Sequence, residues 1–267
     1  MTEPSRTTRP HPRLEVAQDG PLLTVTLDDP SSRNAQVPSL WLALAHLGRT
    51  LPPEVRVVIV RGNGPTFSAG LDRNLIGGAG LPGERSLAHM AAQERGDIAD
   101  EIASYQKGFA IWSEVSAITI AAVQGHAVGA GFQLALACDM RLVADDVQLI
   151  MRETALGLVP DLTGTLPLVR QVGYARALEV CATGRPIGAD EAIAWGLASL
   201  KVPVDDLDEA ARDLADAVMA NPPEAVRELK RLLRFAQSAT PEQQHYAERS
   251  AQARLLSAML AGRNAPA

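Results

Sequence analysis

Two apolar segments, each followed by a glycine-containing turn, constrain the fold of this chain more than any other feature. Residues 57–60 precede the turn SAGLD at 68–72, and residues 118–123 lead into GHAVGAG at 125–131. A buried strand that ends in such a turn and opens a helix leaves several backbone N–H groups unpaired and pointing one way. Two such turns together can bind an oxyanion. The sequence therefore predicts strand–turn–helix units with ligand-binding turns.

Strands and helices alternate in the first half of the chain. Segments rich in β-forming residues predict strands at 22–27, 56–61, 118–123 and 140–143. Apolar residues spaced three and four apart predict helices at 39–47, 97–115 and 132–138. This order is typical of an α/β protein.

After Gly164 the pattern becomes almost wholly helical. The expected helices cover residues 166–171, 175–182, 189–195, 207–220, 224–237 and 242–260. Their apolar stripes must pack against the core or against another subunit, which makes an oligomer plausible.

Composition excludes several classes of protein. The net charge of −6 and the isoelectric point near 5.4 argue against a nucleic-acid partner or an anionic membrane surface. Residues 117–138 form the longest apolar run, but glycines and glutamines interrupt it, so we expect a buried strand, turn and helix and no membrane span. The sequence has no pair of Cys or His residues at a spacing typical of a metal site, so no metal site is predicted. The two cysteines, Cys138 and Cys181, have apolar neighbours and indicate inert thiols in a reducing, cytoplasmic compartment.

Three regions are expected along the chain. Residues 1–13 carry three prolines and no apolar stretch, and they predict a disordered tail. Residues 14–200 form the expected core, and residues 201–267 the C-terminal helical region. The glycine-rich segment 76–83 fits either a mobile lid or a plain flexible connection.

Five segments, in this order and at this spacing, carry a resemblance over residues 14–262. They are DDPSSRNAQ (28–36), FSAGLD (67–72), VQGHAVGAGFQLALACD (123–139), ETALGLVP (153–160) and TGRPIGADEAIAWGL (183–197). The chain resembles the crotonase, or enoyl-CoA hydratase/isomerase, superfamily. The resemblance implies an α/β fold of repeated ββα turns around a spiral, with C-terminal helices that build trimers or dimers of trimers. It also implies an acyl-CoA substrate, an enolate intermediate and no cofactor beyond the CoA moiety.

Matching positions imply a site residue by residue. The backbone N–H groups of Leu71 and Ala130 would form the oxyanion hole. Removing a proton beside a thioester places negative charge on the carbonyl oxygen, and one preorganised donor there is worth about 3 kcal/mol. Ala130 stands where many relatives have glycine, but the donor is a backbone group. The residues that would bind the CoA nucleotide and pantetheine are Arg33, Ala35, Ser68, Ala69 and Asp72.

Two side chains decide which reaction the hole would support. Hydratases of this superfamily hold a water between two glutamates, and this chain has Gln133 at the first position and Glu153 at the second. General acid–base catalysis needs a titratable group, which an amide is not. Gln133 therefore weakens the expectation of ordinary hydration.

A second carboxylate favours isomerisation. Asp161 follows Glu153 by eight residues, a spacing similar to the carboxylate pair of the dienoyl-CoA isomerase branch, although Leu162 and Thr163 add one residue before Gly164. One carboxylate would remove a proton from the acyl chain and the other would return one. Alternatives stay open: Asp161 as a helix cap, Glu153 in a strand-end salt bridge, hydration, or a non-catalytic acyl-CoA-binding protein that has lost one catalytic carboxylate.

Overall fold

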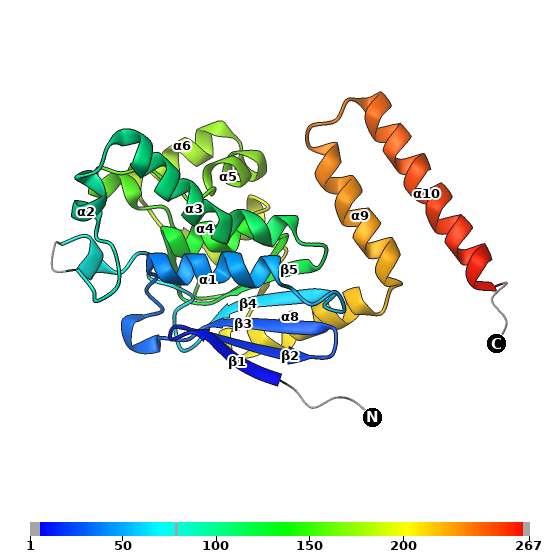
Figure 1. Ribbon diagram of the computed structural model, residues 1–267, viewed down its shortest axis with the longest axis horizontal. Coiled ribbons are helices and arrows are strands. Elements are labelled where there is room, and N and C mark those ends of the chain that lie inside the picture. The colour runs from blue at the N-terminus through cyan, green and yellow to red at the C-terminus, as the bar shows by residue number, and fades with distance from the viewer. Residues whose placement is uncertain (1–5, 78–79, 264–267) are drawn as a thin grey trace.

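A seven-stranded sheet forms the centre of the protein, in the order β1-β2-β3-β4-β5-β7-β10 (Figure 1). The computed structural model describes residues 6–77 and 80–263, with side chains through residue 260. The strands are β1 (Arg6–His11), β2 (Leu14–Asp19), β3 (Leu22–Leu27), β4 (Val57–Gly62), β5 (Ile118–Val123), β7 (Met140–Ala144) and β10 (Leu200–Val202). The first three strands pair antiparallel, and every pairing from β3 to β10 is parallel. A smaller sheet contains β6 (His126–Val128), β8 (Gln148–Ile150) and β9 (Ile187–Gly188).

Helices cover both faces of the large sheet. The longer ones are α1 (Pro38–Arg49), α3 (Arg95–Glu114), α4 (Ala130–Ala137), α5 (Thr165–Val172), α6 (Tyr174–Thr183), α8 (Leu207–Met219), α9 (Pro223–Ala236) and α10 (Pro241–Arg263). The shorter ones are α2 (Leu87–Ala91), α7 (Ala189–Ala194), η1 (Pro30–Ser32), η2 (Arg73–Leu75), η3 (Glu153–Leu156) and η4 (Val204–Asp206). Val58 and Val60 of β4 point into the cluster shared with α1, α3 and α4, whereas Val57 and Ile59 point toward α8. This alternation follows from the two-residue period of a strand.

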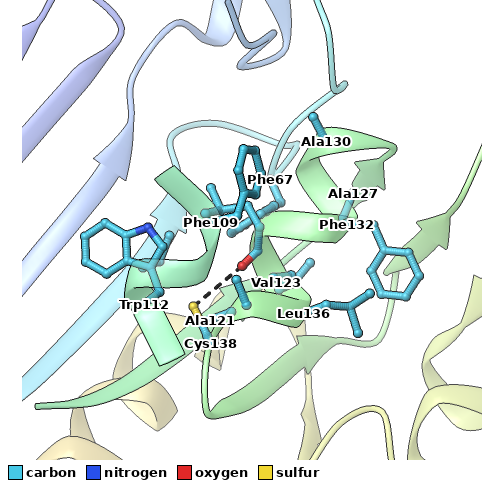
Figure 2. Close-up of a cluster of buried hydrophobic side chains, with 14 of the residues drawn as sticks. Phe67, Phe109, Trp112, Ala121, Val123, Ala127, Ala130, Phe132, Leu136 and Cys138 are labelled. Atoms are coloured by element: carbon cyan, nitrogen blue, oxygen red, sulfur yellow. Dashed lines mark hydrogen bonds between the residues drawn. The ribbon is translucent and has the colours of Figure 1, made fainter. Parts of the chain in front are cut away.

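The helix α4 is a core helix whose residues are all buried. Figure 2 shows it beside a cluster of buried aromatic side chains, among them Phe67, Trp112 and Phe132, each 0% exposed. A closely packed interior deforms little, so the direction of the first turn of α4 is fixed. Cys138 lies in the same cluster, and burial raises the pKa of its thiol to about 12, which makes it unreactive.

The expectation of a disordered tail over residues 1–13 is wrong for the described part of that segment. Residues 6–11 form β1, which pairs with β2 from Arg6↔Gln18 to His11↔Leu14. Because β1 is the edge strand of the sheet, no strand on its open side needs a hydrogen bond from the N–H that Pro10 lacks. Residues 1–5 lie outside the described residues, as do residues 78–79 of the segment expected to be a lid or connection.

Predicted and observed elements agree where periodic patterns are long. The strands at 22–27 and 118–123 have the expected bounds, and every helix expected after Gly164 is present within a few residues. The expectation of an almost wholly helical second half missed β9 and β10, which are too short to show a pattern. In the region from residue 201 onward, α8 packs on β4, β5 and β7 and belongs to the core, while α9 and α10 extend from the body of the molecule (Figure 1).

Across residues 6–77 and 80–263, every helix is too short or too polar to cross a membrane.

Candidate active site

The turn at residues 68–72 runs directly beside β6. Ser68 N donates to His126 O at 3.0 Å, and Val128 N donates to Ser68 O at 3.0 Å. Gly70 has φ +81°, and a Cβ there would lie 2.4 Å from Val128 O and 3.6 Å from Ala130 N. Only glycine permits both this backbone conformation and this approach. The two glycine turns predicted from the sequence therefore touch each other.

Leu71 N–H lies on the side of its segment that faces away from Gln36. On its other side, Gln36 N donates to Gly70 O at 2.7 Å, and Asp72 N donates to Gln36 O at 2.9 Å. In an extended segment successive N–H groups alternate in direction, so Leu71 N faces away from Gln36. Ala130 is the first residue of α4, and its N–H has no intrahelical partner. Within the described part of the chain, neither Leu71 N nor Ala130 N donates a hydrogen bond to another protein group.

Gly129 and Gly131 let the backbone come close on both sides of Ala130. Gly129 has φ +50°, while Ala130 has an ordinary helical conformation and tolerates its methyl group. A Cβ on Gly131 would lie 2.7 Å from Ser68 O, so α4 starts against the first turn. The positive end of the α4 dipole adds to the attraction for an anion at this place.

Glu153, the first residue of η3, places its carboxylate beside Gly129. A Cβ on Gly129 would lie 3.1 Å from Glu153 Oε1. Gln133 Nε2 donates to Oε1 at 2.7 Å, whereas Oε2 is buried and receives no hydrogen bond from the described residues. Burial raises the pKa of Glu153, the nearby charge of Asp161 raises it further, and the hydrogen bond from Gln133 lowers it. A buried carboxylate oxygen without a donor is uncommon outside functional sites.

Gln133 joins Glu153 to the loop at residues 161–164. Its Oε1 accepts hydrogen bonds from Leu162 N at 2.9 Å and Gly164 N at 3.1 Å. Within this loop Thr163 has a positive φ of +70°. Both lone pairs of the amide oxygen are therefore occupied, and one of its N–H bonds is given to Glu153.

Asp161 lies close enough to Glu153 for its charge to act on it, and burial raises the pKa of Asp161. The helix-cap alternative is wrong, because the N-cap of α5 is Gly164 and no side chain caps that helix. Gln106 Nε2 fixes the backbone of Asp161 by donating to its carbonyl oxygen at 2.7 Å. The salt-bridge alternative for Glu153 fails too, since no cation pairs with it among the described residues. Burial thus raises the pKa values of both carboxylates.

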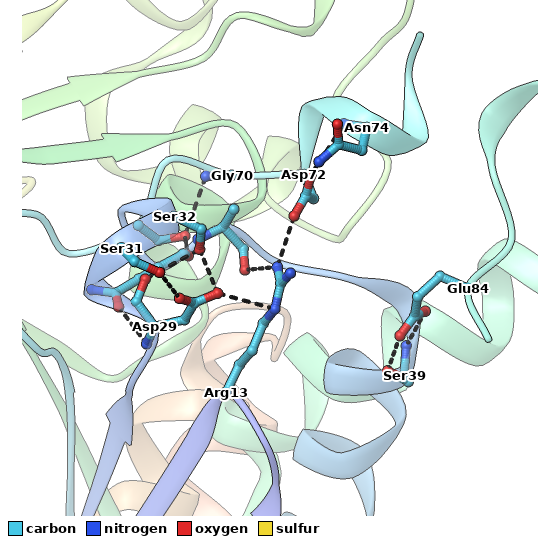
Figure 3. A network of polar contacts seen from close by, with 12 residues as sticks. Arg13, Asp29, Ser31, Ser32, Ser39, Gly70, Asp72, Asn74 and Glu84 are labelled. Atoms are coloured by element: carbon cyan, nitrogen blue, oxygen red, sulfur yellow. Dashed lines mark hydrogen bonds and ion pairs between the residues drawn. The ribbon is translucent and has the colours of Figure 1, made fainter. Parts of the chain in front are cut away.

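Two of the residues expected to bind CoA use their side chains within the protein. Ser68 is 0% exposed, and its hydroxyl donates to Asn34 O at 2.8 Å and accepts from Gly70 N. Asp72 accepts from Arg13 Nη1 at 2.9 Å through Oδ2 and from Asn74 N at 3.1 Å through Oδ1 (Figure 3). These side chains shape the loop from within.

Two of the other three expected CoA-binding residues, Arg33 and Ala69, are joined by a backbone hydrogen bond. Ala69 N donates to Arg33 O at 2.9 Å, which joins the two loops. Arg33 is exposed with φ +58°, Ala69 is half-buried, and Ala35 is buried. Arg13, which contacts this region, was missed by the sequence analysis because no local pattern relates it to Asp72, 59 residues away.

The described residues contain no group of three or more His, Cys, Asp or Glu side chains arranged to hold a metal ion.

Three known proteins are similar to this chain over most of its length. A crystal structure of a protein from Thermobifida fusca YX in complex with acetoacetyl-CoA has a TM-score of 0.88 and 44% identity, covering 92% of this chain and 95% of that one. An enoyl-CoA hydratase from Bacillus anthracis has a TM-score of 0.78 and 28% identity, covering 90% and 89%. A carnitinyl-CoA dehydratase of Salmonella typhi is 34% identical over 238 residues, which are 87% of this chain and 84% of that protein.

The family model for enoyl-CoA hydratase/isomerase matches residues 18–261, nearly the whole chain. The mixed α/β architecture and the C-terminal helices also match the solved relatives, as the resemblance implied. From this match, the chain belongs to the enoyl-CoA hydratase/isomerase family of the crotonase superfamily.

Proposed function

We propose that the protein isomerises the double bond of an unsaturated acyl-CoA thioester through an enolate. Leu71 N–H and Ala130 N–H would bind the thioester oxygen, and Glu153 would be the base. The observation that carries the proposal is the buried Oε2 of Glu153, which receives no hydrogen bond from the described residues and belongs to a carboxylate beside Gly129, the residue before Ala130. Preorganised donors of this kind are worth about 3 kcal/mol each to the transition state.

The two carboxylates together account for the proton that is removed and the proton that is returned. For a 3-enoyl thioester, Glu153 removes a proton from C2, and the electron pair moves into a dienolate whose oxygen is bound by the two amides. Asp161, which burial biases toward the protonated form, returns a proton at C4, and the double bond then lies between C2 and C3. Exchange with solvent restores both carboxyl groups. No water is added to the substrate, which suits a site where Gln133 is fixed by Leu162 and Gly164.

Hydration or its reverse is the second candidate, and one observation favours it. A relative with 34% identity is named carnitinyl-CoA dehydratase, which removes water from its substrate. In this reading Glu153 alone would take and return the proton, because the amide of Gln133 cannot.

A panel of substrates separates these reactions from a non-catalytic binder. The purified protein would be incubated with 2-enoyl-, 3-enoyl- and 3,5-dienoyl-CoA while thioester absorbance and products are followed. Isomerisation predicts turnover of the 3-enoyl or dienoyl substrate; fast hydration of the 2-enoyl substrate instead would establish the second candidate. Tight binding of all of them with no product would identify an acyl-CoA carrier and refute both.

The proposed reaction needs no cofactor beyond the CoA moiety of the substrate. The expected assembly of the protein is a homotrimer or a dimer of trimers. Apolar side chains on α9 and α10 are exposed in the single chain, and a neighbouring subunit would cover them: Leu229, Leu233, Leu256 and Met259. A reducing, cytoplasmic location remains part of the proposal.

The acid limb of the pH–rate profile should lie at a higher pH than the pKa of an ordinary glutamate. Glu153 must be ionised to accept a proton, and burial raises its pKa, so kcat/KM should fall as the pH drops through that raised value. In Asp161→Asn, turnover of the 3-enoyl substrate should fall across the whole pH range, because no acid is left to return the proton at C4. Initial rates from pH 4 to 9 measure both; turnover equal to wild type in Asp161→Asn would contradict the role of Asp161 as the acid.

Gln133→Glu should move the same limb upward. Leu162 N and Gly164 N would still bind one oxygen of the new carboxylate, leaving the other opposite Glu153 Oε1, where the amide now donates at 2.7 Å. Two carboxylates at such a distance share one proton, so the pair acquires a raised apparent pKa. Isomerisation at pH 7 should therefore fall and recover at higher pH. A profile unchanged from wild type would show that Gln133 does not hold Glu153 in solution.

A further inference from the structure

We infer that Arg13 is a positioning residue that clamps together the two loops proposed to bind the CoA nucleotide, residues 29–35 and 68–72. The inference rests on the proposed function for the identity of the ligand. Arg13 itself lies in the turn between β1 and β2, at the end of the segment that the sequence predicts to be disordered.

The guanidinium of Arg13 reaches both loops at once (Figure 3). Its Nη1 donates to Ala35 O and to Asp72 Oδ2, each at 2.9 Å, and its Nε lies 3.2 Å from Asp29 Oδ2. The Arg13 side chain is 21% exposed, so these contacts are largely shielded from solvent. The rigid fork of a guanidinium holds several acceptors in fixed directions, which a lysine ammonium on a flexible stem does not.

Each carboxylate that Arg13 binds also organises its own loop. Asp29 O accepts from Asn34 N at 2.8 Å, and Asp29 Oδ2 accepts from Ser32 Oγ at 2.6 Å. Asp72 accepts from the backbone at the start of η2. Without Arg13, the carboxylates of Asp29 and Asp72 would lack the cation that lies between them, and the loops would be joined only by bonds such as Ala69 N to Arg33 O and Ser68 Oγ to Asn34 O.

The first loop carries backbone strain that needs such a restraint. Arg33 and Asn34 have φ values of +58° and +54°, a region that residues other than glycine seldom adopt. The buried amide of Asn34 fastens one side of the loop by donating to Thr66 O at 2.7 Å and to Asn63 O at 2.8 Å. The bond from Arg13 to Ala35 O fastens the other side.

His11 holds the backbone from which Arg13 extends. His11 Nδ1 accepts from Arg13 N at 3.0 Å, and His11 Nε2 lies 2.9 Å from Ser39 Oγ at the start of α1. With Nδ1 as an acceptor, the neutral imidazole donates through Nε2 to that hydroxyl. The direction of the Arg13 side chain is therefore set by the strand β1 and the helix α1 together.

The clamp is separate from the oxyanion hole. The backbone groups on either side of Leu71, Gly70 O and Asp72 N, are hydrogen-bonded to Gln36, and neither bond involves Arg13. Loss of Arg13 should consequently weaken the binding of the nucleotide part of the substrate and leave the chemical step unchanged. This split distinguishes positioning from a general structural role, which would affect every substrate equally.

The test compares Arg13→Met with Arg9→Met. Arg9, on β1, also pairs with two carboxylates, Glu15 and Asp28, but its side chain is 52% exposed and contacts neither loop residue bound by Arg13. For Arg13→Met we expect the Kd for CoA, measured by calorimetry, and the KM for an acyl-CoA to rise about tenfold, with kcat within about twofold of wild type. The N-acetylcysteamine thioester of the same acyl group, which lacks the nucleotide, should keep its KM. Arg9→Met should match wild type on every measure.

An equal loss with both thioesters, or an unchanged Kd for CoA in Arg13→Met, would overturn the clamp. If wild type binds no CoA, both the proposed function and the clamp are refuted. If wild type binds CoA and Arg13→Met binds it with the same Kd, only the clamp is refuted. Should Arg13→Met not fold, Arg13→Lys serves instead, and its Kd for CoA must exceed that of wild type.

Discussion

Replacing Glu153 with glutamine should lower kcat by roughly 100 to 10,000-fold, the range that a positioned general base contributes. Glutamine keeps the length and shape of the side chain and can still accept the hydrogen bond that Gln133 donates to Oε1. The change removes the negative charge and the ability to take a proton at Oε2, the buried oxygen that receives no hydrogen bond from the described residues. Rates with a 3-enoyl-CoA or dienoyl-CoA, compared at saturation, measure the effect.

The same variant should bind CoA normally and be no less stable than wild type at pH 7. Burial raises the pKa of Glu153 in the folded protein, so the ionised carboxylate opposes folding at any pH above that value. Removing the charge relieves this cost, and the relief should shrink as the pH falls through the raised pKa. Thermal unfolding at several pH values tests this sign. Turnover close to wild type in Glu153→Gln would remove Glu153 from the mechanism altogether.

Gly70→Ala should lower kcat about 100 to 1,000-fold, the effect of removing one donor from an oxyanion hole. The added methyl group would lie 2.4 Å from Val128 O, a backbone atom that cannot move aside as a flexible side chain can. The turn carrying Leu71 would therefore shift away from the turn carrying Ala130. Because the two N–H groups must converge on one oxygen, even a small separation weakens both hydrogen bonds.

Gly196→Ala is the control for Gly70→Ala. Gly196 also has a positive φ, +74°, and a Cβ there would meet nothing within 4 Å. Both variants bear the cost of a positive φ, about 1 kcal/mol or somewhat more, but only Gly70→Ala disturbs the hole. Steady-state rates and thermal unfolding of the two proteins separate these effects. If both lost activity to the same extent, the cause would be destabilisation and the proposed hole would have no support from this experiment.

The sequence alone predicted the parts of the fold that depend on local pattern. The strand at 118–123 and the long helix around 97–115 follow from the periods of their apolar residues, and the structure has β5 and α3 there. The glycine-containing turns at 68–72 and 125–131 also come from the local sequence, and in the structure Gly70 and Gly129 have positive φ. Short strands such as β10, and the edge strand β1, gave no pattern of their own; they form because a neighbouring strand offers them hydrogen-bond partners.

Only the tertiary structure decided which side chains meet. The bond between Gln133 and Glu153 spans 20 residues of sequence, and the one between Arg13 and Asp72 spans 59. The raised pKa of Glu153 likewise depends on burial, which arises from every element packed around it. Local backbone conformation is set by neighbours along the chain, and it can be predicted from them. Contacts and protonation depend on groups that folding brings together from distant positions, and so the sequence determined the two turns while the packed structure determined the chemistry between them.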